Sequence, residues 1–305
     1  MRKYFIVLVV SYILFSCSGS HHDKIKIGFV GDILLDRGVR KEIDKRGIDN
    51  FYDILHRQLP QTDYLIGNLE CPLTQIENPV HKKFVFKADT VNAKYLWECG
   101  FTHLSMANNH AYDQGRGGLV NTYNVLEKQK IRALGYGSSL NEACEPITVN
   151  RNGIQISIFS TVTLALENWY PLPYKPCICQ DMGKSFIDRV GNYAKSKPDN
   201  HIIIYIHWGI EHFQEPSPRQ RKLAKSLIDI GADLIIGHHP HVLQTHEVYK
   251  EKHIFYSLGN FIFDQKDSIN TNTEMILVEF SNSGYEIVRK QYGIIEGIPL
   301  QRSSL

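Results

Sequence analysis

The chain has 305 residues, of which 43% are hydrophobic, 11% aromatic and 22% charged. This composition excludes a disordered or collagen-like chain, and the length is compatible with one large α/β domain that buries a full core. The charges nearly balance, with 34 Lys and Arg against 32 Asp and Glu and no long run of one sign, so nothing favours nucleic acid as the partner.

The first residues have the layout of a secretory signal peptide. A positive start at residues 1–3 precedes an apolar run over residues 4–15 that is short for a membrane span. Cys17 ends a Leu-Phe-Ser-Cys sequence that resembles a bacterial lipobox, in which cleavage precedes a lipid-carrying cysteine. We therefore expect a lipoprotein signal peptide over residues 1–16, a lipidated cysteine and tether over residues 17–23, and a single exported domain over residues 24–305.

An uncleaved anchor helix with a chance cysteine is the alternative for this segment, and it also leaves the domain outside the cytoplasm. Ser18 follows the cysteine in place of the Asp that is often linked to inner-membrane retention. The expected location is therefore the cell envelope, with the outer membrane or periplasm favoured.

The other five cysteines form no obvious framework; they are Cys71, Cys99, Cys144, Cys177 and Cys179. An odd number cannot all pair, and their spacing matches no zinc motif. The close pair at 177 and 179 is compatible with a loop clip or a metal ligand pair. We interpret all five as structurally neutral.

From Lys24 onward, short β-rich runs alternate with longer amphipathic runs, which is typical of an α/β protein. Strands are predicted over residues 24–30, 63–66, 102–106, 154–160, 201–207, 233–236 and 253–257, several of them apolar on both faces, as buried strands are. Helices are predicted over residues 89–99, 117–129, 184–196 and 217–230. Turn sequences at 150–153 and 281–284 predict hairpins, and hence two sheets with antiparallel edges.

Side chains of the kind that bind metals follow five of these strands. They are Asp32; Asn68 and Glu70; Asn108, Asn109 and His110; His207; and His238, His239 and His241. Ligands of open α/β sheets bind beyond the carboxyl ends of the strands, so we expect these residues to converge, with the neighbouring glycines allowing sharp turns. Oxygen and imidazole donors without an obvious Ser or Cys nucleophile suit one or two Zn, Mn or Fe ions and predict metal-assisted hydrolysis.

Each feature alone also fits a structural role. Asp32 suits a turn or a helix cap, the two asparagines before His110 suit a turn, and His207 suits a hydrogen-bonded core position. Three histidines within four residues around Pro240 are harder to explain in this way. Because coincidence would have to act at five strand ends, we favour a shared metal site.

Together these motifs resemble the bacterial CapA family of capsule-synthesis and poly-γ-glutamate biosynthesis proteins. The resemblance extends from about Lys24 to Phe263 and includes Gly31-Asp32, Gly67–Glu70, Ala107–His110, His207–Glu211, Gly231–His241 and Tyr256–Phe261. It implies an α/β fold of calcineurin-like metallophosphoesterase architecture, a four-layer αββα sandwich.

The resemblance also implies roles for individual residues. The implied metal ligands are Asp32 and His241 at the first metal, Glu70 as the bridging carboxylate, and Asn109, His207 and His239 at the second metal. His110 would donate a proton to the leaving oxygen, which requires the protein to separate the pKa values of its imidazoles.

Two positions depart from the wider phosphoesterase pattern. Leu34 stands where that pattern has a histidine ligand, so the first metal site would be weak or empty. Glu70 replaces an aspartate and is one methylene longer, which would alter the bridging geometry. Asp36 is a possible substitute ligand, although we interpret it as an ordinary loop carboxylate.

Four further residues are candidates for substrate contact. Arg37 is suited to grip a phosphate or carboxylate, Lys83 lies in a basic-aromatic segment, Glu211 follows the His207 motif, and Asn260 ends a strand. A solvated surface explains the lysine equally well, and a structural turn explains Asn260.

We therefore expect a lipid-anchored, CapA-type, metal-dependent hydrolase of phosphoester-type bonds. Its expected partners are an anionic cell-surface polymer or phosphoester substrate, the membrane through the lipid anchor, and other capsule-synthesis subunits. The alternatives are a non-catalytic component that binds or exports the polymer, and a hydrolase or transferase for the amide bonds of a glutamyl polymer.

Overall fold

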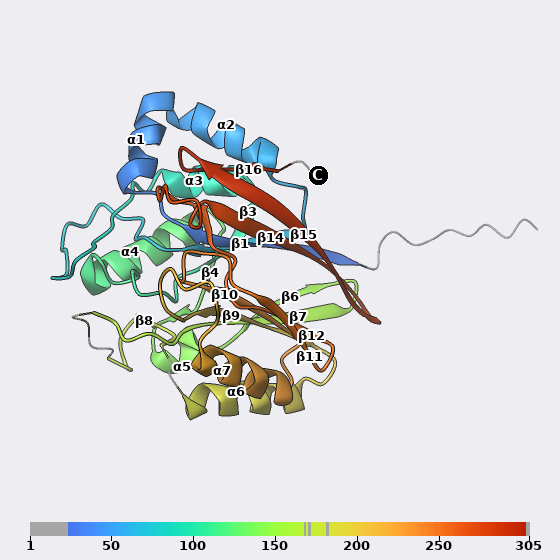
Figure 1. Cartoon of the computed structure of the whole chain (residues 1–305). Helices are drawn as coiled ribbons and strands as arrows, with labels where there is room; N and C mark the ends of the chain where they lie inside the picture. Colours follow the sequence, from blue (N-terminus) through green and yellow to red (C-terminus); the bar gives the residue numbers. More distant parts are fainter. Residues whose placement is uncertain (1–23, 168, 170–171, 181–182, 303–305) are drawn as a thin grey trace, which may run out of the picture.

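Two β-sheets pack face to face, and helices cover the outer face of each (Figure 1). The computed structural model describes residues 24–167, 169, 172–180 and 183–302. The predicted signal peptide, Cys17 and the tether lie outside the described residues. The arrangement confirms the predicted α/β fold class and its four layers of helix, sheet, sheet and helix.

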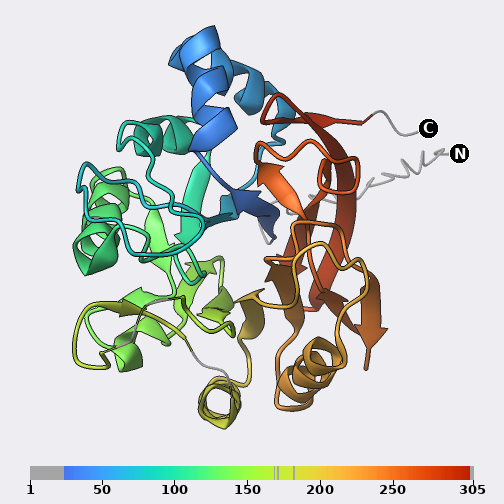
Figure 2. The same ribbon diagram turned by 60° about the vertical axis from the view of Figure 1, so that its left-hand side comes forward.

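The first sheet has the strand order β16-β15-β14-β1-β2-β3-β4. Its strands are β1 (Ile25–Ile33), β2 (Tyr64–Leu69), β3 (Phe101–Ser105), β4 (Arg132–Leu134), β14 (Asn272–Ser281), β15 (Gly284–Ile295) and β16 (Ile298–Gln301). Strands β1 to β4 are parallel, whereas β14, β15 and β16 add an antiparallel edge. A short strand, β13 (Asn260–Ile262), pairs with the end of β1, and Figure 2 shows the two side by side.

The second sheet has the order β11-β12-β10-β9-β7-β6. Its strands are β6 (Ile147–Arg151), β7 (Ile154–Val162), β9 (His201–His207), β10 (Leu234–His238), β11 (His246–Tyr249) and β12 (Lys252–Phe255). A separate two-stranded ribbon joins β5 (Tyr136–Gly137) to β8 (Cys177–Ile178). The hairpins predicted at 150–153 and 281–284 are confirmed, since they link antiparallel β6–β7 and β14–β15.

Helices α1 (Arg37–Arg46), α2 (Ile48–Gln58), α3 (Asn92–Glu98) and α4 (Gly115–Lys128) lie over the first sheet, and α6 (Lys184–Ser196) and α7 (Pro218–Asp229) lie over the second (Figure 1). The short α5 (Leu140–Ala143) packs beside β5 and β8. Helix α7 begins at Pro218 because Ser217 and Gln220 form a capping box. Sequence analysis missed α1, in which only Val39 and Ile43 are buried, too few apolar residues for a clear helical period.

The space between the sheets is filled by alternate residues of the central strands. In β9, Ile203 and Tyr205 belong to this inter-sheet core, whereas Ile202 and Ile204 belong to the core beneath the helices. Side chains alternate along a strand, so a strand buried on both faces has a continuous apolar sequence. Among the described residues, no helix combines the length and apolarity needed to cross a membrane.

Candidate metal centre

The carboxyl ends of strands from both sheets bring the predicted metal ligands together. Two groups of side chains each have ligand atoms within 4.8 Å of one another: Glu70 with His239 and His241, and Asp32 with Glu70 and His207. All five residues are buried. Glu70 belongs to both groups, so its carboxylate lies between them.

The backbone around these ligands is closely packed and locally strained. His239 and His241 have φ angles of 97° and 57°, in the left-handed region that non-glycine residues seldom adopt. Of the flanking glycines, Gly209 after the His207 motif has a φ of 93°, which fits the predicted sharp turn, whereas Gly31 and Gly237 serve close approach. A Cβ on Gly31 would lie 1.9 Å from the oxygen of Gly259, and one on Gly237 would lie 2.1 Å from the oxygen of Tyr256.

Asp32 is the hydrogen-bonded carboxylate of the centre. Its Oδ1 accepts from Asn68 Nδ2 at 2.7 Å, and its Oδ2 accepts from the main-chain nitrogen of His239 at 3.3 Å and lies 3.4 Å from His241 Nδ1. Burial acts to raise the pKa of Asp32, but the hydrogen bond and charge of His241 outweigh it and hold the pKa well below its usual range. Asp32 is therefore a fixed negative charge.

Glu70 is the unsatisfied carboxylate of the centre. It is completely buried, and neither side-chain oxygen has a hydrogen-bond partner among the described residues. Its Oε1 lies 3.5 Å from His241 Nε2 and 3.9 Å from His110 Nε2. Burial, followed by the charge of Asp32, raises the pKa of Glu70 well above its usual range. A buried carboxylate without donors is costly, and a cation held between Glu70 and the imidazoles would satisfy it.

The imidazoles of the centre differ in protonation, but not in the predicted order: the pKa of the predicted metal ligand His241 is raised and that of the predicted proton donor His110 is lowered. Burial lowers the pKa of His207 well below its usual value, and burial together with the charge of His241 lowers that of His239 to about 3. Burial also opposes the protonation of His241, but the charge of Glu70 and the hydrogen bond to Asp32 raise its pKa to about 9. Two rings are therefore neutral, the form that binds metals, and the third holds a proton that a metal would displace.

The predicted ligand Asn109 and the ring of His207 are already in contact. Asn109 Oδ1 lies 2.9 Å from His207 Nε2, and the other ring nitrogen of His207 lies 3.2 Å from Asn68 Nδ2. Asn260 is not among the clustered ligands but contacts one of them: its Oδ1 is 2.8 Å from His241 Nδ1 and orients that ring.

His110 borders the centre from the first sheet. Its Nε2 faces Glu70, its Nδ1 lies 2.8 Å from Asp113 Oδ2, and its ring stacks on Phe86 at 4.2 Å. Burial lowers the pKa of His110, and the hydrogen bond to Asp113 opposes this shift.

The remaining predicted residues lie outside the cluster. Arg37 forms two hydrogen bonds with Asp264, at 3.0 and 2.6 Å, and its guanidinium lies 5.5 Å from the centre of the Phe86 ring. The Lys83 ammonium lies 4.9 Å from the centre of the Phe84 ring. Glu211 is exposed in the loop after β9.

The two positions that depart from the phosphoesterase pattern are also placed. Leu34 is fully buried in the core that includes Val39 and Ile43 of α1. Asp36 accepts from the main-chain nitrogen of Lys87 at 2.8 Å and pairs with Arg40, so it is the loop carboxylate that we expected.

Sequence analysis missed the residues that hold the ligands in place. Asn108 donates to Asn68 Oδ1 at 3.1 Å and to the main-chain oxygen of Leu69 at 2.8 Å, which joins the ends of β2 and β3. Asp113 follows His110 by three residues, a spacing that was visible in the sequence. Lys82, which contacts both His110 and Asp113, had no local signal because tertiary contacts alone bring it there.

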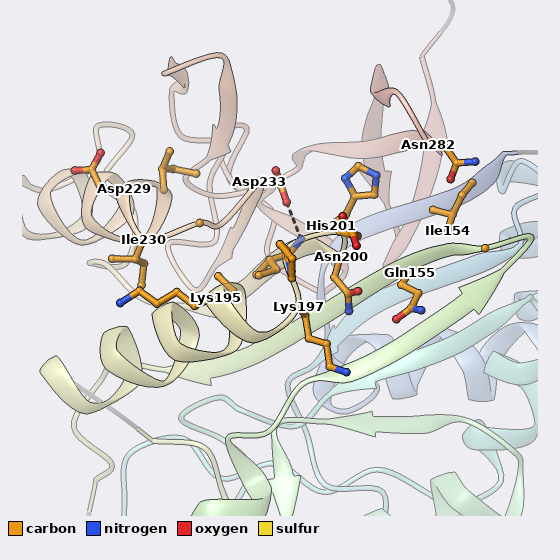
Figure 3. A pocket seen from close by; sticks show the side chains of 17 residues that line it. Ile154, Gln155, Lys195, Lys197, Asn200, His201, Asp229, Ile230, Asp233 and Asn282 are labelled. Carbon is orange, nitrogen blue, oxygen red and sulfur yellow. Dashed lines mark hydrogen bonds between the residues drawn. The ribbon is translucent and has the colours of Figure 1, made fainter.

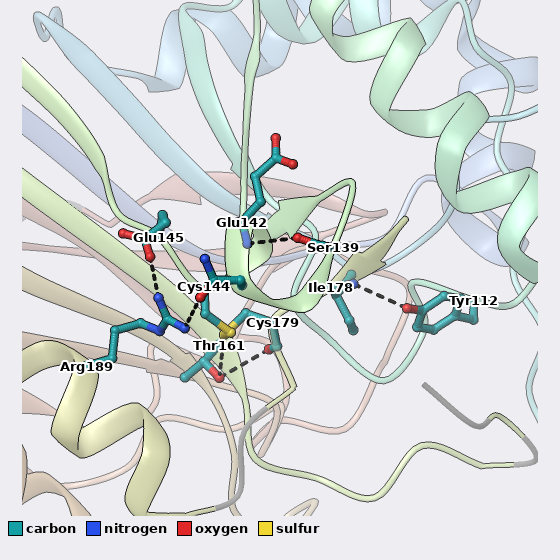
Figure 4. Close-up of a disulfide and its surroundings, with 10 residues drawn as sticks. Tyr112, Ser139, Glu142, Cys144, Glu145, Thr161, Ile178, Cys179 and Arg189 are labelled. Atoms are coloured by element: carbon teal, nitrogen blue, oxygen red, sulfur yellow. Dashed lines mark hydrogen bonds and ion pairs between the residues drawn. A yellow bond between two sulfur atoms is a disulfide. The ribbon is translucent and has the colours of Figure 1, made fainter. Parts of the chain in front are cut away.

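The interpretation of all five cysteines as neutral is wrong for two of them. Cys144 and Cys179 form a disulfide that joins the end of α5 to the segment after β8 (Figure 4). The two cysteines are 35 residues apart, and the pairing of β5 with β8 brings them together. Cys71, Cys99 and Cys177 are free and buried.

A second hollow lies at the opposite, amino ends of β7, β9 and β10, around Lys195, Lys197, Asn200 and His201 (Figure 3). It encloses about 790 Å³. Its described lining residues belong to neither group of potential metal ligands. This hollow therefore differs in chemistry from the centre at the carboxyl ends.

Comparison with known proteins agrees with this site. Residues 26–265 match the family of the bacterial capsule synthesis protein PGA_cap. The chain is 33% identical over 265 residues to the PGA biosynthesis protein CapA of Bacillus subtilis, covering 86% of this chain and 69% of that protein. It is 30% identical over 275 residues to the capsule biosynthesis protein CapA of Bacillus anthracis, covering 88% and 66%. The chain thus spans about two thirds of the length of these relatives.

The fold is similar to that of a putative 5'-nucleotidase from Staphylococcus aureus, solved in complex with alpha-ketoglutarate. The TM-score is 0.54 at 11% identity, covering 92% of this chain and 55% of the nucleotidase chain, and this likeness concerns the fold alone. The family match over residues 26–265 covers both sets of clustered ligands and ends before β14. On this evidence the chain belongs to the family of bacterial capsule synthesis proteins.

Proposed function

We propose that this protein is a metal-dependent hydrolase of phosphoester-type bonds that acts in the synthesis of a capsule, of poly-γ-glutamate or of a related cell-surface polymer. One observation carries the proposal. Glu70 is a fully buried carboxylate without a hydrogen-bond partner among the described residues, and it is shared by two groups of potential metal ligands. Structural carboxylates in protein interiors are normally paired.

The donor set fits one or two divalent ions of the Mn, Zn or Fe type. The residues that would hold them are Asp32, Glu70, Asn109, His207, His239 and His241, all oxygen or imidazole donors. The Nδ1 atom of His239 also lacks a partner in the described structure, as an open ligand position would. A bound divalent ion would lower the pKa of a water molecule and polarise a phosphoryl oxygen.

The chain's own residues supply orientation and a proton. Asn68 and Asn260 fix the carboxylate of Asp32 and the ring of His241 by hydrogen bonds at 2.7 and 2.8 Å. His110 Nε2 faces the same space as Glu70, so this ring would donate a proton to the leaving oxygen. Arg37, Lys83 and Glu211 would contact the substrate outside the cluster, and Arg37 would first have to leave Asp264.

Export and lipid attachment at Cys17 are part of the proposal. The disulfide between Cys144 and Cys179 supports export, because such bonds persist in oxidising compartments such as the bacterial periplasm. The protein would then act in the cell envelope, held to a membrane by its lipid, alongside other capsule-synthesis subunits. Globomycin treatment of expressing cells tests the anchor: accumulation of an uncleaved precursor is expected, and processing that is unaffected would contradict it.

Elemental analysis of the purified chain, together with hydrolysis of bis(4-nitrophenyl) phosphate, tests the metal centre. Bound metal and turnover are expected in the wild type and should both be lost in the variant His239→Ala/His241→Ala. The control is His246→Ala/His253→Ala, which removes a pair of imidazoles 2.9 Å apart that belongs to no group of potential metal ligands among the described residues. A folded wild-type chain that binds no metal would contradict the proposal.

A second function is a non-catalytic one, in which the pocket binds an anionic polymer during assembly or export. The burial of Leu34 supports it, because no ligand can reach the centre from that position. Tight polymer binding by the metal-loaded chain without turnover of phosphoesters would favour this function. Cleavage or transfer at amide bonds of a glutamyl polymer uses the same residues, and a peptide substrate panel distinguishes it.

A further inference from the structure

The segment between β2 and α3 places a lysine in the wall of the metal centre. Lys82 Nζ lies 2.9 Å from the main-chain oxygen of Asn109 and 3.2 Å from His110 Nδ1, and it forms an ion pair with Asp113 Oδ1. The exposed fraction of its side chain is only 4%, and that of Asp113 is 0%. Lysine is almost never buried to this extent unless it is paired, so a specific set of contacts holds it there.

The two oxygens of Asp113 have different partners. Oδ1 faces Lys82, whereas Oδ2 lies 2.8 Å from His110 Nδ1 and accepts from the main-chain nitrogen of Phe86 at 2.6 Å. The Lys82 ammonium can only donate and the ionised carboxylate can only accept, and Asp113 Oδ2 at 2.8 Å is the nearer of the two to His110 Nδ1, so we assign the ring proton to Nδ1 and Lys82 acts through Asp113 Oδ1 and the main-chain oxygen of Asn109. The other ring nitrogen, Nε2, is then the one directed at Glu70, 3.9 Å away.

The same ammonium also fixes the main chain that carries the neighbouring ligand. Asn109, whose main-chain oxygen accepts from Lys82, holds His207 Nε2 through its side-chain oxygen at 2.9 Å. Phe86, four residues beyond Lys82, stacks on the His110 ring at 4.2 Å between ring centres. The segment over residues 82–86 thus contacts His110 through a cation and a ring, and it also holds the carboxylate of Asp113.

We propose that Lys82 is a positioning residue for His110: it holds Asp113 and the main chain of Asn109 so that His110 presents Nε2 to the space around Glu70. The kinetic consequence rests on the proposed hydrolase function. As water attacks phosphorus, the bond from phosphorus to the leaving oxygen breaks and its electron pair goes to that oxygen. His110, which holds its first proton on Nδ1, takes a second proton at Nε2 from solvent before the step; the leaving oxygen takes this Nε2 proton, the ring keeps its Nδ1 proton, and the attacking water releases a proton to solvent.

The first test measures dependence on the leaving group in the metal-loaded full chain. Lys82→Met is compared with wild type on 4-nitrophenyl phosphate, whose leaving group departs without a proton, and on a simple alkyl phosphate, whose leaving group needs one. We expect kcat for the alkyl ester to fall about 100-fold and kcat for the nitrophenyl ester to change less than about fivefold, because general acid catalysis contributes on this scale. The control Lys94→Met, at an exposed pair with Glu98 on α3, should change neither.

The second test needs no turnover. The ¹⁵N signals of the His110 ring, assigned with His110→Gln, should show an Nδ1-protonated ring in the wild type and a mixture of tautomers in Lys82→Met. Metal content, measured by elemental analysis, should be the same in both. If Lys82→Met does not fold, Lys82→Gln replaces it, with the same expected shift in both tests.

An equal fall of kcat on both esters with unchanged His110 signals would overturn the inference, since it would make Lys82 a purely structural residue. A wild-type chain that hydrolyses neither ester would remove the proposed function, and the nitrogen signals would then decide the positioning of His110 by themselves.

Discussion

The two ends of the sandwich use carboxylates in opposite ways: those at the amino end are partly exposed and those at the carboxyl end are fully buried. At the amino end, Asp63 accepts from the main-chain nitrogen of Lys26 at 2.8 Å and pairs with Arg151, and Asp233 accepts from that of Ile202 at 2.8 Å and lies 2.6 Å from Lys252 Nζ. Each aspartate thus fixes the start of a neighbouring strand and is neutralised by a permanent cation. At the carboxyl end, Asp32 and Glu70 have no arginine or lysine partner among the described residues.

The difference separates carboxylates that stabilise the fold from carboxylates that await a ligand. Asp63 and Asp233 each have a main-chain donor and a cation, which comes from the other sheet for Asp63 and from the same sheet for Asp233, so the folded chain gains from them. Glu70 is surrounded by a second carboxylate and by imidazoles, and both its burial and the charge of Asp32 disfavour its ionised form. Replacing a carboxylate at the carboxyl end should therefore abolish function without lowering stability. Replacing one at the amino end should lower stability without abolishing function.

Among the substitutions that test this difference, Glu70→Gln should have the largest effect on metal affinity. Loss of the shared carboxylate is expected to weaken metal binding on the order of 1,000-fold, the scale of removing one partner from a buried charge pair. The metal-free variant should be no less stable than the metal-free wild type, because the carboxyl group that is replaced has no hydrogen-bond partner among the described residues. Metal titration and thermal unfolding with and without metal measure both.

The matched control for this change is Glu274→Gln. Glu274 is also a buried glutamate, but Arg289 donates to both of its oxygens, at 3.0 and 2.7 Å. Its variant should lose stability and keep the metal affinity of the wild type. If Glu70→Gln behaved like Glu274→Gln, the distinction between carboxylates that are paired and carboxylates that await a ligand would fail.

Removal of the disulfide should lower stability without touching the centre. The double variant Cys144→Ser/Cys179→Ser opens a link between residues that are 35 positions apart in the chain. In the chain-entropy description this costs about 3–4 kcal/mol of unfolding free energy. Denaturant unfolding of the variant and of the oxidised wild type measures the cost, and an accompanying loss of bound metal would show that the link also shapes the site.

The proton on His241 should make metal binding depend on pH. Its pKa of about 9 in the metal-free chain is raised above the unfolded value of 6.5, so its stabilising effect is present below pH 6.5 and is lost as the pH rises through 9. Metal requires the neutral ring, so affinity should rise about tenfold per pH unit, or about 100-fold between pH 7 and pH 9. Calorimetric titration in two buffers should show proton release; a flat profile would contradict the assignment.

Asp233→Asn should have the smallest effect. It weakens a main-chain cap and a partner for Lys252, and a loss of about 1–3 kcal/mol of unfolding free energy is expected. Metal content and affinity should not change, because the residue lies at the start of β10 and not at its end. A variant as stable as the wild type would mean that the amino-end carboxylates contribute nothing specific.

The sequence alone determined which segments form the central buried strands and which kinds of side chain are available as metal ligands. Continuous apolar runs such as residues 201–207 marked buried strands, because a strand covered on both faces has no polar period. Asp32, Glu70, His207, His239 and His241 were identifiable because polar donors beside apolar strands are conspicuous at short range. Helix α1 was not, since only two of its residues are buried.

Only the tertiary structure determined which of the polar and charged side chains already have a partner within the protein. The pairing of Arg37 with Asp264 and the insertion of Lys82 beside His110 join residues that are 227 and 28 positions apart. The disulfide was hidden for the same reason, because β5 and β8 had to pair first. The residue type determines what a side chain can bind. Whether that side chain already has a partner within the protein depends on its burial and on the charges of residues distant in the sequence, and only the folded chain brings those residues within reach.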